Sequence, residues 1–126
     1  MGDITENFSY SEFKCKSGRV MPNDIKPNIA ALAENLQVLR NYLHASIHIT
    51  SGYRDPHYNK QVGGASSSQH MKGFAADITV KGYTPKAVHA VIEGLIAQGK
   101  MKQGGLGLYK GWVHYDIRGV HARWHG

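Results

Sequence analysis

The chain is 126 residues long, 41% of them hydrophobic, and carries a formal net charge of +6. This size and apolar content are typical of one core, so we expect residues 1–126 to form a single domain. Cys15 is the only cysteine, which excludes an internal disulfide. The positive charge favours an anionic partner, but no Lys/Arg-rich run with interleaved aromatic residues is present, so we do not expect nucleic-acid binding.

We expect no targeting signal in the N-terminal segment. Residues 1–6 have neither a basic stretch nor an apolar stretch, so no signal peptide is predicted. No later stretch is apolar over the length that spans a bilayer, so we expect no membrane insertion. Ser9 and Glu12 have the spacing of a capping box, which predicts one helical turn in a packed N-terminal arm.

Two longer helices are predicted from apolar residues that recur every three or four positions. The first covers residues 27–44, and the second covers residues 85–98, with Thr84 as N-cap and Gly99 as the stop. Residues 46–50 alternate in the manner of a strand. The expected buried stripes are Ile29, Leu32, Ala33, Leu36, Leu39, Tyr42 and Leu43 in the first helix, and Val88, Val91, Ile92, Leu95 and Ile96 in the second.

Arg54 lies at a predicted junction between a strand and a helix. The chain leaves the strand through residues 51–54, and Asp55 followed by Pro56 predicts the start of a short helix. The Arg54 guanidinium either binds a carboxylate or carbonyl oxygen of a substrate, which we favour, or pairs with a nearby acid. Tyr58, on the short helix, either lines the same cleft or lies on the surface.

Two later segments alternate with the period of a strand. In residues 75–80, Asp77 lies on the less apolar face. In residues 112–118, His114 and Asp116 lie on the face opposite the apolar residues. If the two strands pair, these three polar side chains share one face of the sheet.

A histidine from the preceding loop completes a candidate metal site. His70 lies just before the first of these strands, where Gly73 gives the loop the freedom to fold the imidazole back toward Asp77. Two imidazoles and a carboxylate without a fourth protein ligand are the donors of a catalytic zinc site, which keeps one position open for water. Asp116, beside His114, is then either a general base or a group that orients the imidazole.

The expected architecture is α+β, a small antiparallel sheet with the two long helices on its apolar face and the metal site on its other face. His121, in the tail of residues 119–126, is a further catalytic candidate. His89 and Glu93 are four residues apart, but the second histidine of a His-Glu-x-x-His motif is absent, so we expect no zinc site there.

The segment Ser68-Gln-His-Met-Lys-Gly-Phe-Ala-Ala-Asp77, followed by a late His114, resembles the zinc D-Ala-D-Ala peptidases of the peptidase M15 family. This family cleaves bacterial peptidoglycan stems and shares its fold with the Hedgehog signalling domain. The resemblance extends from residues 8–13 through 51–54 to 113–118. It implies one zinc ion, with His70, Asp77 and His114 as its ligands.

The resemblance also bears on the general base and the substrate contacts. Several relatives place an acidic base three residues before the last histidine, where this chain has Gly111. The closer match is to the subgroup ending in His-x-Asp-x-Arg, in which Asp116 is the natural candidate for the base. The residues expected to contact the substrate are Arg54, Tyr58, Ser68 and Gln69.

The function implied by the resemblance is zinc-dependent hydrolysis of amide bonds in peptidoglycan stem peptides. Arg54 suits a terminal carboxylate, so we expect D-Ala-D-Ala carboxypeptidase activity. The alternatives are an endolysin-type L,D-endopeptidase and a non-catalytic, zinc-stabilised binding module. The small size, the basic charge and the lack of a signal peptide would suit a monomeric phage or prophage enzyme that reaches the cell wall after phage-mediated release or by export.

Overall fold

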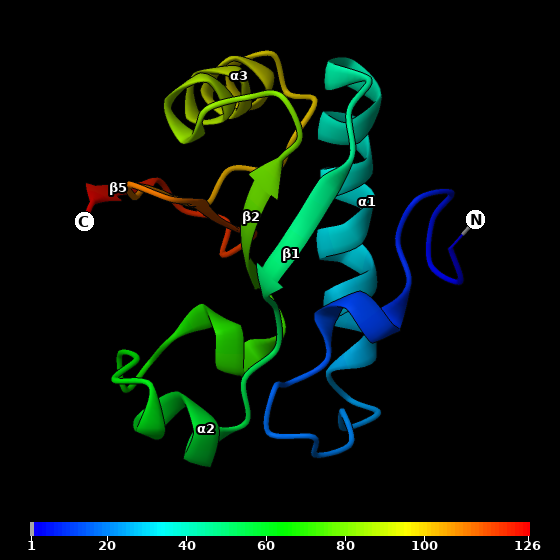
Figure 1. Ribbon diagram of the computed structural model, residues 1–126, viewed down its shortest axis with the longest axis vertical. Coiled ribbons are helices and arrows are strands. Elements are labelled where there is room, and N and C mark those ends of the chain that lie inside the picture. Colours follow the sequence, from blue (N-terminus) through cyan, green and yellow to red (C-terminus); the bar gives the residue numbers. More distant parts are fainter. Residues whose placement is uncertain (1) are drawn as a thin grey trace.

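The computed structural model describes residues 2–126 and has the predicted α+β architecture (Figure 1). Five strands form one sheet in the order β1-β2-β4-β3-β5. No helix of the described residues combines the length and the apolar character needed to cross a membrane. The elements are η1 (Tyr10–Phe13), α1 (Lys26–Leu43), β1 (Ile47–Ser51), α2 (Pro56–Gln61), η2 (Gln69–Lys72), β2 (Ala75–Val80), α3 (Pro85–Ala97), β3 (Gly105–Leu108), β4 (Val113–Asp116) and β5 (Ala122–His125).

The two long helices bury their apolar stripes in one core with the apolar face of the sheet, as predicted. The N-cap prediction for α3 is confirmed, because the Thr84 hydroxyl accepts a hydrogen bond from the Ala87 N–H at 3.1 Å. The predicted burial of Tyr42 is wrong, since it is 57% exposed. Tyr42 lies about 100° around α1 from Leu43, which turns its side chain out of the stripe. The fully buried helix residues include Ile29, Leu32, Leu36, Leu39, Val88 and Ile92.

The prediction of an antiparallel sheet holds except at one edge. The pairs β1/β2, β2/β4 and β4/β3 are antiparallel, whereas β5 runs parallel to β3. The chain reverses direction after β4, so that β5 is antiparallel to β4. Because β3 lies between them in the sheet and is itself antiparallel to β4, β5 must run parallel to β3.

The register of the sheet aligns a row of residues on the face opposite the core. Asp77 of β2 is directly opposite Ser51 on β1 and His114 on β4. His114 is opposite Gly107 on β3, which in turn is opposite Trp124 on β5. The row therefore crosses all five strands and places the two predicted sheet ligands side by side.

The N-terminal arm packs against the loop that leads to the site. Its predicted capping box is present, with the Ser9 N–H donating to the Glu12 carboxylate at 2.8 Å. Phe13 is fully buried, and its carbonyl accepts from the Tyr53 N–H at 2.8 Å. A Cβ on Gly52 would lie 2.7 Å from the Phe13 Cα, so this close approach requires glycine.

The core predicts a clear contrast between a buried and an exposed substitution. Leu36→Ala removes a fully buried side chain and should lower the free energy of unfolding by about 2–5 kcal/mol. Val120→Ala, at a residue that is 65% exposed, should change it by less than about 0.5 kcal/mol. Urea denaturation followed by circular dichroism measures both values. Equal effects of the two substitutions on the free energy of unfolding would contradict the placement of Leu36 in the core and of Val120 on the surface.

Candidate metal centre

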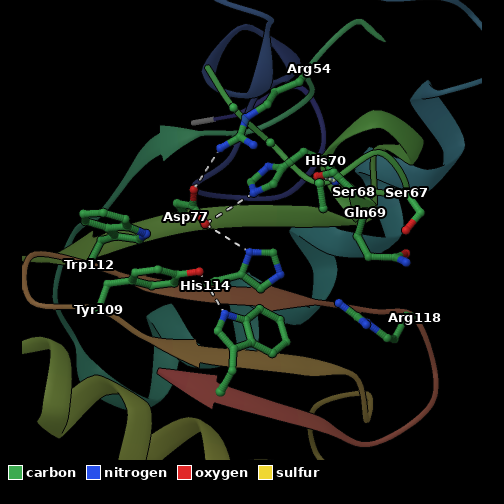
Figure 2. A pocket seen from close by; sticks show the side chains of 14 residues that line it. Arg54, Ser67, Ser68, Gln69, His70, Asp77, Tyr109, Trp112, His114 and Arg118 are labelled. Carbon is green, nitrogen blue, oxygen red and sulfur yellow. Dashed lines mark hydrogen bonds and ion pairs between the residues drawn. The ribbon is translucent and has the colours of Figure 1, made fainter. Parts of the chain in front are cut away.

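The structure brings together the three residues expected to bind a metal. One ligand atom from each of His70, Asp77 and His114 lies within 4.8 Å of the others, and all three residues are buried. Asp77 and His114 are cross-strand neighbours on β2 and β4, and His70 is supplied by η2 (Figure 2). The alternation of the two strands and the loop before β2 thus produce the predicted cluster.

Local hydrogen bonds fix the orientation of His70. Its Nδ1 lies 2.8 Å from the Gly52 carbonyl oxygen. Because a carbonyl can only accept, Nδ1 must carry the hydrogen, which leaves the lone pair on Nε2. The Ser68 hydroxyl accepts from the His70 N–H at 3.2 Å, and Gly73 ends the turn with a φ of 76°. These contacts direct Nε2 toward Asp77, 3.3 Å from its Oδ1.

Asp116 orients the His114 ring so that Nδ1, rather than Nε2 as in His70, faces Asp77. Its Nε2 lies 2.7 Å from Asp116 Oδ2, and its Nδ1 lies 3.1 Å from Asp77 Oδ1. Burial raises the pKa of Asp116, but hydrogen bonds from His114, Arg118 and the Gly105 N–H outweigh this and hold it well below its usual range. The ionised carboxylate accepts the Nε2 hydrogen of His114, which leaves the lone pair on Nδ1.

The cluster has the donor chemistry of a zinc site. Burial raises the pKa of Asp77, but its contacts with His114 and His70 lower it further, so the carboxylate is ionised. When both rings are neutral, two imidazole lone pairs face one carboxylate oxygen, and these electron-rich groups repel one another unless a proton or a metal cation lies between them. Burial also lowers the pKa of His114, but Asp116 and Asp77 raise it to a net value above normal, so the site attracts positive charge. Two nitrogens and one oxygen fit zinc with a position left for water.

The cluster lines a pocket of about 410 Å³ that contains most of the predicted substrate residues. Arg54, Ser68 and Gln69 line it together with the three metal-binding candidates (Figure 2). The structure does not bring Tyr58 or His121 to this pocket. Tyr58 packs its ring against the core, and His121 is exposed in the turn before β5.

Arg54 makes the ion pair that was the alternative to substrate binding, and it also lines the pocket. Its Nη2 lies 3.4 Å from Asp77 Oδ2, so it pairs with a nearby acid. Its Nε and Nη1 contact the Ser51 hydroxyl and the Asn59 side-chain oxygen at 3.2 and 3.3 Å. The predicted N-cap that follows it is confirmed, since Asp55 accepts from the backbone of α2. The guanidinium is thereby held at the pocket wall beside the metal-binding candidates.

The position of Asp116 favours the orienting role over the role of general base. Its side chain is fully buried and does not line the pocket. Besides His114, it accepts hydrogen bonds from the Gly105 N–H at 2.8 Å and from Arg118 Nε and Nη2 at 2.9 and 2.8 Å. A Cβ on Gly105 would collide with this carboxylate, so the strand is shaped to receive it. Of the described residues that line the pocket, only Asp77 carries a carboxylate.

Three aromatic residues and Arg118 also line the pocket; of these, only Trp124, with its neighbour Arg123, was considered from the sequence as a wall of the cleft. Tyr109 and Trp112 stack with their ring centroids 4.6 Å apart and their planes 9° from parallel. The Trp124 ring lies 5.0 Å from the His114 ring, and the Arg118 guanidinium lies 5.4 Å from the Trp124 ring. The alternation of residues 112–118 gave one usable signal, because it placed Trp112 and Arg118 on the same face as His114.

The orienting role of Asp116 predicts a metal-affinity phenotype. Asp116→Asn should weaken zinc binding by roughly 10–100-fold, because the imidazole loses the anion that fixes its hydrogen on Nε2. Competition with a chromophoric chelator measures the affinity. Glu34→Gln, at an exposed residue of α1, is the matched control and should bind zinc as the unmodified chain does. Unchanged zinc affinity in Asp116→Asn, with turnover lost, would instead support the general-base role.

Comparison with known proteins covers the part of the chain that forms the site. A family model described as peptidase M15 matches residues 6–116, a range that includes His70, Asp77 and His114. A curated relative, the zinc D-Ala-D-Ala carboxypeptidase of Streptomyces albus G, is 36% identical over 78 residues. The aligned part covers 57% of this chain and 31% of that relative, so the chain spans about a third of the relative's length. Because the family model covers most of the chain, the chain belongs to the peptidase M15 family.

Proposed function

We propose that this protein is a zinc peptidase that removes the terminal D-Ala from peptidoglycan stem peptides ending in D-Ala-D-Ala. The observation that carries the proposal is the convergence of the lone pairs of His70 and His114 on the Asp77 carboxylate inside an open pocket. Membership of the peptidase M15 family and the name of the Streptomyces relative support the reaction and the substrate class.

The proposed cofactor is one zinc ion, held by His70 Nε2, Asp77 and His114 Nδ1. When bound, zinc supplies Lewis-acid chemistry that makes water a nucleophile near neutral pH. The protein's own contribution is to hold the Asp77 carboxylate ionised and to fix which ring nitrogen of each histidine carries the hydrogen, so that the other nitrogen faces Asp77. The Gly52 carbonyl fixes the hydrogen of His70, and Asp116 fixes that of His114.

Arg54 is the proposed partner of the substrate's terminal carboxylate. It lines the pocket, and its three nitrogen contacts of 3.2–3.4 Å hold the guanidinium next to Asp77. A guanidinium can bind a carboxylate through two parallel hydrogen bonds. A carboxylate held there would place the last amide bond of a stem peptide near the metal-binding residues. Ser68 and Gln69 line the same pocket and offer polar contacts to the peptide.

The proposed setting is the bacterial cell wall. The formal charge of +6 suits a polymer that carries phosphate and carboxylate groups. An endopeptidase acting on an internal bond of the same stem, and a zinc-stabilised binding module without catalysis, are the competing functions. Both are distinguished from the carboxypeptidase by the product of the reaction.

The proposal predicts the product of a reaction with purified muropeptides. Zinc-loaded protein should release one D-Ala from pentapeptide stems, as read by mass spectrometry. Chelation should abolish the release and added zinc should restore it, whereas His114→Ala should stay inactive because a donor is missing. An internal cut would move the protein to the endopeptidases. No cleavage by fully loaded protein would count against a peptidase and favour the binding module.

The assignment of Arg54 predicts how the enzyme discriminates between substrates. Arg54→Gln should lower kcat/KM for a peptide with a free terminal carboxylate by roughly 10–100-fold, because a charge-assisted pair is worth about 1.5–3 kcal/mol. The same peptide with an amidated terminus should be a poor substrate for both forms, so the preference for the free acid should shrink. Lys60→Gln, an equal loss of charge on the exposed part of α2, should leave the preference unchanged. A full preference retained in Arg54→Gln would refute the assignment.

A further inference from the structure

Tyr109 is placed in the pocket by the turn between β3 and β4. It follows β3 directly, and its N–H donates to the Trp112 carbonyl at 3.0 Å, which closes the turn. The stacked ring of Trp112 covers one side of the phenol. Figure 2 shows both rings on one wall of the pocket, with the Tyr109 hydroxyl directed toward His114.

The hydrogen bond made by Trp124 determines what the Tyr109 hydroxyl can do. Trp124 Nε1 lies 2.8 Å from the Tyr109 oxygen. An indole N–H can only donate, so the phenol oxygen is the acceptor and its own hydrogen is left for another acceptor. A hydroxyl that accepts a hydrogen bond is polarised and becomes a stronger donor. Tyr109 therefore presents a donor to the pocket.

Trp124 is itself held in place next to the metal-binding candidates. Its ring lies 5.0 Å from the His114 ring. In the sheet, Gly107 of β3 lies between Trp124 on β5 and His114 on β4. A Cβ on Gly107 would collide with the indole, so the indole lies directly over a position without a side chain. The chain of contacts from His114 through Trp124 to the Tyr109 oxygen fixes the phenol close to the site of reaction.

We propose that Tyr109 is a catalytic residue whose hydroxyl donates a hydrogen bond to the carbonyl oxygen of the scissile amide as that oxygen gains negative charge. The inference rests on the proposed amide hydrolysis and adds a residue to it. A donor that is fixed before the reaction stabilises developing charge without having to reorganise. Of the two arginines that line the pocket, Arg54 is already assigned to the terminal carboxylate, and Arg118 is paired with the buried Asp116.

The test compares Tyr109→Phe with the unmodified protein. Tyr109→Phe keeps the stacked ring and removes only the hydroxyl, so kcat should fall by roughly 10²–10³-fold with little change in KM, in zinc content or in Tm. Trp124→Phe removes the indole donor and should also lower kcat, but by a smaller factor than Tyr109→Phe. Tyr83→Phe is the matched control, because it removes a hydroxyl that bonds the Leu43 carbonyl at 3.2 Å outside the pocket, and it should keep full kcat.

A binding measurement gives a readout that does not depend on turnover. A phosphinate analogue of D-Ala-D-Ala carries oxygens where the tetrahedral intermediate would carry them. Calorimetry should show that Tyr109→Phe binds it roughly 10²-fold more weakly, while binding of the product peptide changes by less than about twofold.

The outcomes separate the two proposals. If the unmodified protein is active and Tyr109→Phe matches it in kcat and in phosphinate affinity, Tyr109 is not catalytic, whereas the proposed function stands. If Tyr109→Phe loses zinc or unfolds, the hydroxyl has a structural role and the inference is overturned. If the unmodified protein neither cleaves stem peptides nor binds the phosphinate, the proposed function fails and the role of Tyr109 fails with it.

Discussion

Three buried electron-pair donors meet at one point between β2, β4 and η2, and the rest of the structure serves to keep them there. The shared atom is Asp77 Oδ1, with the free nitrogens of His70 and His114 at 3.3 and 3.1 Å. Such a set is unfavourable without a positive charge, since the donors have also lost much of their contact with water. Hydrogen bonds to the Gly52 carbonyl and to Asp116 hold the two rings in this arrangement, which a cation between the donors would stabilise.

The contacts behind the donors explain why small residues surround the site. Gly52 offers its carbonyl to His70 while packed against the backbone of Phe13, so the N-terminal arm supports a ligand. Gly105 makes room for the Asp116 carboxylate, and Gly107 makes room for the indole of Trp124. Two glycines on one face of β3 therefore control the orientation of His114 and the wall beside it. The glycine face of β3 shapes this site as much as the strands that carry the ligands.

Much of the site follows from strand periodicity, whereas its surroundings depend on long-range pairing. A period of two placed Asp77 and His114 on one face, and helical spacing identified the residues that α1 and α3 bury, apart from Tyr42. The same period could not show that Asp116 turns away from the pocket, because that depends on a glycine of another strand. The parallel pairing of β5 with β3 leaves no local signal in four residues, so the position of Trp124 beside Tyr109 was not predictable.

The most direct test of the account is the protonation pattern of the two histidines in the zinc-loaded protein. Long-range ¹⁵N–¹H correlation spectra distinguish the ring nitrogen that carries hydrogen from the one that binds metal. The account predicts opposite patterns, with hydrogen on Nδ1 of His70 and on Nε2 of His114, because Gly52 and Asp116 are their acceptors. Metal on Nε2 of both rings, or no change in either ring when zinc is added, would contradict it.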